Sequence, residues 1–449
     1  ISLSPQSTTV KAGFSHLYLA TVTGTTNTAV SWTVSDMPGD SSYPGSILSG
    51  QYTAPDPVYQ SETFLITAVS TADQSKSANA SVTVVPLENQ QIQDLPIKLG
   101  TSGINANSND CCTGTLGSLL TDQNGKRYIL SNNHILGRVN HAVPGEDILQ
   151  PGLVDALCDA TKTKTVAKFT AATPIQAGVD AAIAEVVPGA VDPQGATIGL
   201  GGVAADGSYL PGYTANTITD PEVGMSVAKS GRTTGLSCST VSDVSAVVNV
   251  DIKAECGNPT EISVRFSDQI IAANFANYGD SGSLMIDATT ARPVGLVASL
   301  TSDHVYTAAN PIREVLNALD FATGLQLSFV GGIQHSVSCS PQGPASPLTH
   351  AVTPLDLPPA ELSKALEVHH RHAQSLAADP AVVAVAVGRS QKNPGTAVID
   401  VFVERGRSPA SSLPVELDGV EVQIIPSARF KAVLEKPNGL ALCQSHRYR

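Results

Sequence analysis

Charge is scarce in this sequence, and most of it is negative. Only 14% of the 449 residues are charged, and 39 Asp and Glu outnumber 26 Lys and Arg, which leaves a net charge of −13. Nucleic acids and anionic membrane surfaces are bound by a basic face, so we expect neither as a partner. Runs of about 18 or more apolar residues are also missing, and we therefore expect no membrane insertion.

Patterns for targeting and for metal binding are missing as well. The chain opens directly on "ISLSPQSTTV", with no signal-peptide pattern, as expected of a mature secreted protein or a trimmed chain. Neither CxxC nor HExxH occurs, so we expect no metal and no cofactor. His369, His370 and His372 lie on one predicted helix, where a solvated face is the expected role rather than a metal site.

Seven cysteines are too few for a disulfide-built scaffold in a chain of this length. Cys238 and Cys256 flank a predicted hairpin and could pair, as could Cys339 and Cys443, although sequence alone does not determine connectivity. Such disulfides, together with a Ser- and Thr-rich surface of low charge, predict an oxidising, extracytoplasmic location, either secreted or at the cell surface.

The chain is too long for one ordinary domain, and its amino-acid composition and residue pattern change along the sequence. Residues 1–86 alternate apolar and hydroxylated residues in short runs, which predicts an antiparallel sandwich. Residues 87–330 predict a pair of β-barrels ending in one helix. Residues 331–358, rich in Pro and Gly, predict a linker. A helix followed by strands over 359–435 predicts a small α+β domain, and 436–449 a frayed tail. The expected fold class is mainly β.

The stretch "NYGDSGS" at 277–283 holds Ser281 between two glycines, either in an ordinary tight turn or in a loop that presents a nucleophile. A nucleophilic serine needs a base, an acid that orients the base, and donors for the oxyanion. His134 in "SNNHIL" follows a hydrophobic strand, and Asp180 in "VDAAIA" opens an apolar run. His, Asp, Ser is one of the orders in which a catalytic triad occurs. Asp155 and Asp159 are rival acids, but they lie in or beside a turn-rich stretch where we expect solvated carboxylates.

These motifs resemble those of trypsin-like serine peptidases of the chymotrypsin fold, and the resemblance covers residues 100–330. "ILSNNHIL", "LQPGLVD", "VDAAIA" and "VAKSGRTTGL" are similar to a bacterial and plant branch of the narrow-leaf type. Residues 1–86, with "AVSWTVS" and "GQYTAPD", resemble bacterial immunoglobulin-like domains. The resemblance implies an immunoglobulin-like sandwich, then a double β-barrel of chymotrypsin type, in a secreted serine endopeptidase that acts on proteins or peptides. A homo-oligomer is left open as a further partner.

The resemblance also implies a role for each motif residue. Ser281 attacks the scissile carbonyl, His134 transfers the proton, and Asp180 orients the imidazole. The N–H groups of Gly279 and Ser281 form the oxyanion hole, and Asp280 holds the loop through a buried pair or a hydrogen bond. Animal trypsins need a new N-terminus inserted near this loop. Because many residues precede the peptidase segment here, we expect a site that forms without processing.

Specificity is indicated by three residues. By the resemblance, Phe275 lies at the base of the primary pocket, Ser299 on the strand that lines it, and His304 on the loop that follows. His304 could contact the substrate there, but a simple loop histidine is the expected role. No Asp stands at the base to attract Lys or Arg, so an apolar or small side chain is expected. "KSGRTTG" at 229–235 is interpreted as a tight turn between strands rather than a phosphate loop.

The sequence leaves two alternatives open. The peptidase fold can also serve as an inactive scaffold in a cell-surface adhesion or binding protein. The domain at 359–435 is expected to pack against the peptidase or another subunit, and its alternative role is to regulate access to the cleft.

Overall fold

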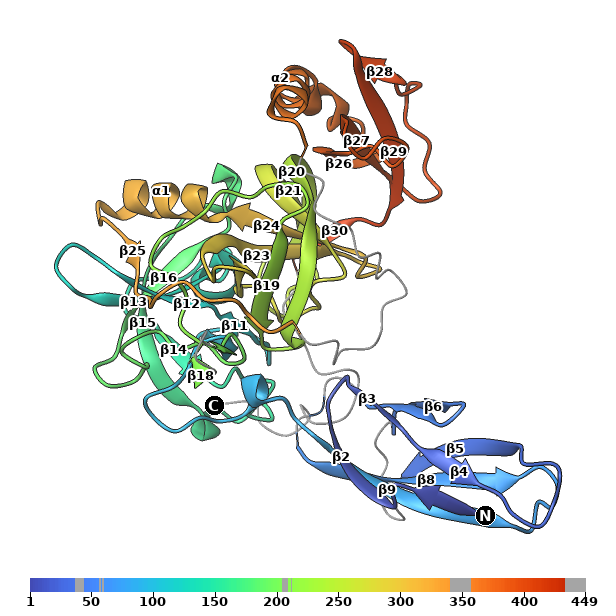
Figure 1. Ribbon diagram of the computed structural model, residues 1–449. Helices are drawn as coiled ribbons and strands as arrows, with labels where there is room; N and C mark the ends of the chain where they lie inside the picture. The colour runs from blue at the N-terminus through green and yellow to red at the C-terminus, as the bar shows by residue number, and fades with distance from the viewer. Residues whose placement is uncertain are drawn as a thin grey trace. The chain divides into compact units, whose positions relative to one another are not determined.

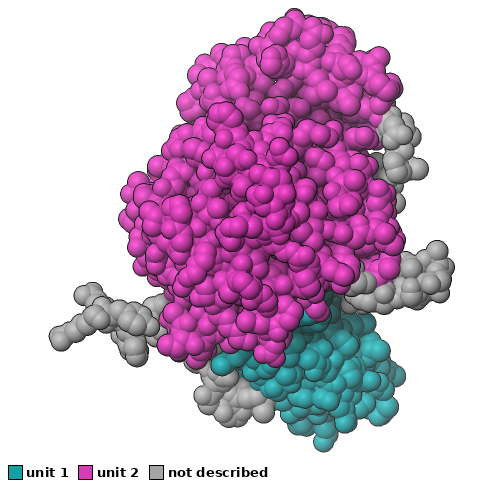
Figure 2. Space-filling model, turned by 90° about the vertical axis from the view of Figure 1, so that its left-hand side faces the viewer, with its two compact units in different colours: residues 1–90, 340–349 teal, residues 91–339, 350–449 magenta. Residues whose placement is uncertain are grey.

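The computed structural model describes residues 1–36, 44–55, 58, 60–203, 209–210, 212–339 and 357–432. These residues fall into two compact units, coloured separately in Figure 2: residues 1–90 form one, and residues 91–339 with 357–432 form the other. Strands outnumber helices in both, which confirms the prediction of a mainly β protein. No helix in the described ranges is both long and apolar enough to cross a membrane.

The unit of residues 1–90 is built from short strands with one buried face. The strands are β1 (Ser2–Ser4), β2 (Ser7–Lys11), β3 (Ser15–Leu17), β4 (Leu19–Thr21), β5 (Val30–Asp36), β6 (Ser46–Leu48), β7 (Gln51–Thr53), β8 (Glu62–Ser70) and β9 (Ser77–Val85), followed by the 3-10 turn η1 (Glu88–Gln90). These strands form three sheets, with the strand orders β2-β9-β8-β5, β3-β7-β6 and β1-β4. Alternate residues of β8, including Phe64, Ile66 and Ala68, are buried in the core, as expected for a strand whose side chains point alternately to the core and away from it.

The first half of the larger unit is one strongly curved sheet, named the first barrel here. Its strands are β10 (Thr101–Asn105), β11 (Gly114–Leu116), β12 (Ser118–Thr121), β13 (Arg127–Ser131), β14 (Asp147–Gln150), β15 (Lys164–Ala172) and β16 (Ala182–Val186), with β25 (Ser328–Phe329) beside β12. β10 pairs with β11, and β12 pairs with β13. Only Gly117 separates β11 from β12, and its N–H donates to the Leu130 carbonyl at 2.9 Å, so the two ends of the sheet meet. Three short turns interrupt the chain: η2 (Asn133–Gly137), η3 (Ala160–Lys162) and η4 (Ile175–Ala177).

A second barrel follows, after the small ribbon of β17 (Gly202–Val203) and β18 (Tyr209–Leu210). Its strands are β19 (Ser226–Gly231), β20 (Gly235–Lys253), β21 (Glu261–Ala273), β22 (Leu284–Asp287), β23 (Pro293–Thr301) and β24 (Tyr306–Pro311). They run in the order β19-β22-β23-β24-β21-β20, and β19 also pairs with β20, which closes the ring. Helix α1 (Ile312–Thr323) buries Ile312, Val315 and Leu319 in a hydrophobic cluster with residues of both barrels, and it ends at Gly324, whose φ of +71° suits glycine.

The chain stays with the barrels beyond the predicted start of the linker at 331. Gly332 bridges to Ala215, Val337 is buried, and Cys339 is bonded to Cys238. The remaining part of the predicted linker that the structure describes, Leu357 and Pro358, leads directly into the C-terminal helix.

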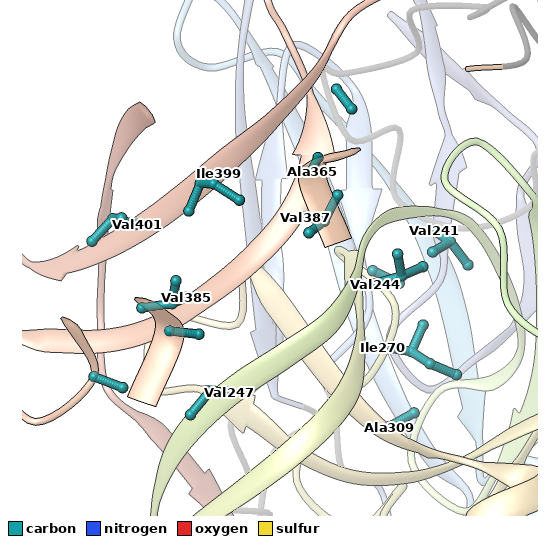
Figure 3. Close-up of a cluster of buried hydrophobic side chains, with 14 of the residues drawn as sticks. Val241, Val244, Val247, Ile270, Ala309, Ala365, Val385, Val387, Ile399 and Val401 are labelled. Carbon is teal, nitrogen blue, oxygen red and sulfur yellow. The ribbon is translucent and has the colours of Figure 1, made fainter. Parts of the chain in front are cut away.

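The C-terminal module, defined here as residues 357–432, continues the sheet of the second barrel. It contains α2 (Pro359–Leu376), β26 (Val382–Arg389), β27 (Ala397–Glu404), β28 (Glu416–Leu417), β29 (Val420–Ser427) and β30 (Phe430–Ala432), labelled in Figure 1. β26 pairs antiparallel with β20, placing Val385 opposite Val247 and Val387 opposite Val244. One hydrophobic cluster therefore contains residues of both the second barrel and the module. Figure 3 shows its side chains from β20 and β21 beside those of β26 and β27.

The disulfides differ from the suggested pairs. They join Cys111 to Cys158, Cys112 to Cys256, and Cys238 to Cys339. The suggestions of Cys238 with Cys256 and of Cys339 with Cys443 are therefore wrong, and Cys443 itself lies outside the described residues. The physical reason is that Cys256 sits at the far end of the long β20–β21 hairpin, close to Cys112 of the first barrel, whereas Cys238 lies near the start of β20.

Two carboxyl groups are buried where the module joins the barrel. Asp243 of β20 and Asp400 of β27 both lie against the backbone of Gly388. A side chain at this position would place its Cβ 2.6 Å from Asp243 Oδ1 and 2.0 Å from Asp400 Oδ2. Gln423 donates to Asp400 Oδ1 at 2.8 Å. Burial, reinforced by the neighbouring Asp243, raises the pKa of Asp400 to about 10, and burial also raises the pKa of Asp243. At neutral pH the pair therefore keeps a proton that the unfolded chain would release.

This proton should make stability fall as the pH rises. Above the unfolded aspartate pKa of about 3.9, the folded chain binds a proton that the unfolded chain lacks, so the free energy of unfolding decreases until the folded pKa is passed. Between about pH 5 and pH 9, the melting temperature of Asp400→Asn should therefore fall much less than that of the wild type. Thermal unfolding followed by circular dichroism measures both. Asp418→Asn is the matched control, because this exposed carboxyl has a lowered pKa and should keep the wild-type slope. Equal slopes for Asp400→Asn and the wild type would contradict the shared proton.

Candidate active site

His134 and Asp180 lie side by side in the first barrel. His134 belongs to η2, directly after β13, and Asp180 precedes β16, the strand that pairs with β13. The His134 ring nitrogen Nδ1 is hydrogen-bonded to Asp180 Oδ2, and the His134 backbone N–H donates to Asp180 Oδ1 at 3.1 Å. The two residues are 2% and 0% exposed, so this contact is shielded from water.

Two asparagines fix the position of Asp180. Asn132 Nδ2 donates to the Asp180 carbonyl at 2.6 Å, and the Asp180 N–H donates to Asn310 Oδ1 at 3.2 Å. Because a carboxylate faces Nδ1, the ring proton belongs on Nδ1 and Nε2 becomes the acceptor. His134 Nε2 is buried and has no hydrogen-bond partner among the described residues. The arrangement thus presents an oriented base whose basic nitrogen is free.

Ser281 lies in a turn of the second barrel that packs against the first. Its carbonyl accepts a hydrogen bond from the Thr115 N–H at 2.9 Å, and a Cβ at Gly282 would stand 2.1 Å from Ser131 Oγ. Ser131 ends the strand that leads into His134. Ser281 Oγ donates to the Ala298 carbonyl at 3.4 Å rather than to the imidazole. The structure therefore brings the serine turn to the strand that leads into His134, with the Ser281–His134 hydrogen bond not made.

The turn also leaves two backbone donors free. Neither the Gly279 N–H nor the Ser281 N–H donates to an acceptor in the described part of the chain. Gly279 has a φ of +92°, a conformation that side chains with a Cβ rarely adopt. Free N–H groups next to a serine hydroxyl are the donors that an oxyanion would need.

Asp280 holds this turn through a buried ion pair. Lys229 Nζ lies 2.9 Å from Asp280 Oδ2, and both side chains are fully buried. The N–H groups of Thr233 and Thr234 donate to Asp280 Oδ1 at 2.8 and 3.1 Å. Burial alone would raise the pKa of Asp280, but the Lys229 ammonium and the hydrogen bonds outweigh it and hold the pKa below its usual value. The segment 229–235 is a tight turn between β19 and β20, as expected, and its N–H groups bind a carboxylate of the chain itself.

The rival acids stand apart from His134. Asp155 is not the solvated carboxylate that its turn-rich sequence predicted. Its side chain is 2% exposed and accepts from Arg232 at 2.5 and 2.9 Å and from Ser102 Oγ. Arg232 is itself fully buried, so the Arg232 guanidinium needs this carboxylate as its partner. Asp159 is 39% exposed and accepts from the Thr161 N–H at the start of η3.

The three predicted specificity residues lie in different surroundings. Phe275 is buried in the hydrophobic cluster that includes Val241 and Met285. Ser299 is buried on β23, next to an irregularity in the pairing with β24. The His304 ring packs edge-on against Tyr278, with the centroids 4.9 Å apart, and so reaches the serine turn. Burial lowers the pKa of His304, although Asp303 beside it acts in the opposite direction.

The histidines of α2 do not form one solvated face. His369 is buried, and its Nε2 is hydrogen-bonded to the Val385 carbonyl at 3.1 Å, so the expectation of a solvated side chain is wrong at this position. The α2 helix lies against β26, which covers this side of the helix. His372 contacts Asp418 at 2.8 Å on the surface. The described residues contain no cluster of His, Cys, Asp and Glu suited to a metal ion.

Several supporting residues escaped sequence reasoning. Asn132 and Asn310 position Asp180, and Lys229 holds Asp280. Arg232 is the buried partner of Asp155. None of the four was assigned a role. A signal was present for two of them. Lys229 and Arg232 are the two charged residues of the stretch VAKSGRTTGL, and a cation that becomes buried requires a carboxylate partner.

Comparisons with known proteins add little. The chain matches no protein-family model and no curated protein. Among solved structures, Thermobifida fusca protease A is 16% identical, with a TM-score of 0.33, over 53% of this chain and 99% of its own. A glutamic acid-specific serine protease is 16% identical, with a TM-score of 0.35, over 52% and 100%. Cellulomonas bogoriensis chymotrypsin is 18% identical, with a TM-score of 0.31, over 53% and 99%. With TM-scores this low, these likenesses decide neither activity nor specificity.

The ion pair of Lys229 and Asp280 predicts a large loss of stability when one partner is removed. Lys229→Met leaves the Asp280 carboxylate buried without its cation, which should lower the free energy of unfolding by about 3–5 kcal/mol in urea titrations. Lys392→Met is the matched control. Lys392 is 79% exposed in its contact with Glu421, so its loss should change stability by about 0–1 kcal/mol. Similar effects of the two substitutions would show that the buried pair does not hold the turn.

Proposed function

We propose that this protein is a secreted serine endopeptidase with a double β-barrel of chymotrypsin type, in which Ser281, His134 and Asp180 form the catalytic triad. The observation that carries the proposal is the hydrogen bond between Asp180 and His134 Nδ1, which leaves Nε2 free, while the turn of Ser281 packs against the strand leading into His134. Protein or peptide chains are the substrates, and the chemistry needs no cofactor.

The reaction begins with a change of partner for the Ser281 hydroxyl. Rotation about its Cα–Cβ bond releases the Ala298 carbonyl and turns Oγ towards His134 Nε2. As Oγ attacks the scissile carbonyl carbon, its proton passes to Nε2. The imidazolium that forms is stabilised by Asp180 and then gives this proton to the leaving amine. Water hydrolyses the acyl-enzyme by the same proton transfers in reverse.

The negative charge that develops on the carbonyl oxygen requires donors that are already in position. The N–H groups of Gly279 and Ser281 take this role, because neither donates to an acceptor in the described residues. One such donor contributes about 3–4 kcal/mol to transition-state stabilisation in a related system. The Asp280 carboxylate, held by Lys229, keeps the turn in the conformation that leaves these donors free.

Lys229 also supports a site that forms without N-terminal processing. Trypsins of animals insert a new N-terminal amine near the serine turn. Here an amine from within the chain, Lys229 Nζ, already lies 2.9 Å from Asp280. A serine turn held in this way takes its shape as soon as the second barrel has folded, without a new N-terminus.

Location and specificity follow from other features. Three disulfides favour an oxidising compartment, which agrees with a secreted or cell-surface protein whose residues 1–86 form an immunoglobulin-like domain. Phe275, at the base of the primary pocket, carries no charge that would attract a basic substrate side chain. Apolar or small side chains are therefore favoured at the cleavage site. Cleavage profiling with a peptide library measures this preference.

Loss of the nucleophile or the base should abolish peptide hydrolysis. Ser281→Ala and His134→Ala each remove a member of one catalytic unit, so kcat should fall on the order of 10⁶-fold while the melting temperature stays near that of the wild type. A fluorophosphonate probe should label the wild type at Ser281 and leave Ser281→Ala unlabelled. Well-folded wild-type protein that resists the probe would favour the alternative, an adhesion or binding protein built on an inactive peptidase scaffold.

The two buried aspartates should respond differently to the same change. Asp180→Asn alters the tautomer of His134 and should lower kcat about 10⁴-fold with modest loss of stability. Asp155→Asn instead leaves Arg232 without its carboxylate, so it should lower the free energy of unfolding by about 3–5 kcal/mol. Kinetics and urea unfolding on both variants separate these effects. A larger fall in kcat for Asp155→Asn than for Asp180→Asn would overturn the assignment of the acid.

A further inference from the structure

One edge of β23 runs past the reactive serine. At the start of this edge, β22 pairs with residues up to Leu296. Val297 then exchanges two backbone hydrogen bonds with the serine turn, at 2.9 Å to the Gly282 N–H and at 3.0 Å to the Ser283 carbonyl. The next carbonyl, of Ala298, accepts from Ser281 Oγ. The other edge of β23 is occupied by β24 along this whole stretch.

The same serine-side edge continues beyond Ala298, and the chain's own β30 occupies it. β30 pairs antiparallel with β23, with Lys431 opposite Leu300 and Phe430 opposite Thr301. Continuing this register places Ala432 opposite Ser299. Because each strand residue advances about 3.3 Å, β30 approaches the Ser281 hydroxyl with its carboxyl end leading.

That direction is the one a substrate needs. A peptide that presents a carbonyl to Ser281 must be extended, and a strand edge next to the nucleophile can hold it through backbone hydrogen bonds. The residues on the amino side of the scissile bond would then lie along Ser299, Leu300 and Thr301. In the intact chain, Leu300 and Thr301 of this edge are already paired with β30.

We propose that β30 is a built-in competitor that occupies the edge of β23 where the amino side of a peptide substrate binds, so that the intact chain acts slowly on polypeptides until β30 is displaced. The proposal rests on the peptidase function proposed above and adds a regulatory role for the C-terminal module. His134 and Ser281 are 2% and 1% exposed in the intact chain, in accord with a site that polypeptides do not reach freely.

Several contacts hold β30 in this position. On its other side it pairs in parallel with β20, with Phe430 opposite Val250 and Ala432 opposite Ile252. The Phe430 side chain is fully buried among apolar residues of β20, β21 and the module. The backbone before β30 is anchored as well, because the Ser302 N–H donates to the Arg429 carbonyl at 3.0 Å.

Charged contacts secure the same region. Arg429 Nε lies 3.0 Å from Glu404, and Arg405 is paired with Asp303 in the loop after β23. Lys431 Nζ reaches Glu261 of β21 at 3.3 Å. These partly exposed pairs contribute little each, so most of the holding energy comes from the backbone pairing and from Phe430. Displacement is therefore an opening of a short strand and not the unfolding of a domain.

The first test weakens β30 in the full-length protein. β30 has a neighbouring strand on each side, so every N–H in it faces a strand, and Lys431→Pro removes one of these donors. If β30 restricts access, hydrolysis of fluorescent casein by Lys431→Pro should exceed that of the wild type about ten-fold or more, because the competent fraction rises. Ser411→Pro, in an exposed loop of the same module, is the matched control and should leave turnover unchanged.

A small fluorophosphonate probe separates this proposal from the peptidase assignment. The probe reacts at Ser281 without needing the edge of β23, so the wild type and Lys431→Pro should be labelled at rates within about three-fold of each other. Labelling of both with equal casein hydrolysis would overturn the role of β30 and leave the peptidase function standing. Labelling of neither protein, with both well folded, would remove the peptidase function and with it this proposal.

The second test fixes β30 in place and does not depend on a destabilised variant. Leu300→Cys with Lys431→Cys puts two thiols at directly opposite positions, where a cross-strand disulfide can form. Once intact mass confirms the bond, casein hydrolysis should fall well below the wild-type rate, while fluorophosphonate labelling continues. A locked protein that hydrolyses casein at the wild-type rate would show that substrates bind without displacing β30.

Discussion

The conformation of the serine turn depends on one carboxylate that is completely enclosed by protein. Asp280 receives the Lys229 ammonium on one oxygen and the N–H groups of Thr233 and Thr234 on the other. An enclosed carboxylate is tolerated only when its lone pairs are filled, so the serine turn and the tight turn at 229–235 must fold together. The free N–H groups beside Ser281 are a result of this arrangement, because Asp280 is satisfied by other donors.

Sequence reasoning succeeded where the decisive signal was local. Alternating burial along β8 and the helical spacing of α1 reflect contacts within a few residues, so the texture of the chain predicted strands and helices. His134 and Asp180 both sit in short motifs at strand ends, and the structure shows a hydrogen bond between them, while their catalytic roles stay a prediction.

What escaped prediction depends on pairing between distant segments. The solvated role expected for Asp155 failed because its partner, Arg232, lies in the other barrel. The suggested disulfides failed for the same reason, since the long β20–β21 hairpin carries Cys256 to Cys112. Packing of the C-terminal domain was expected, but the placement of β30 between β20 and β23 follows from the register of three strands, which composition does not encode.

The long strand β20 belongs to the barrel and to the module at once. It pairs with β19 near its start, then with β26, and finally with β30 on the same side. Irregular pairing with β21 and a positive φ at Ser245 allow the strand to bend along this course. Backbone pairing and the shared hydrophobic cluster therefore make the module a continuation of the second barrel.

This continuity also determines what the module shields. An unpaired strand edge exposes rows of N–H and C=O groups that other chains can bind, and folded proteins usually cover or charge such edges. On the stretch of β20 from Val244 to Ile252, the cover consists of β26 and β30. This stretch is rich in valine, with Val244, Val247, Val248 and Val250. Without the module, the barrel would expose a long apolar strand edge to other protein molecules. By pairing with this edge, the module also prevents edge-to-edge aggregation.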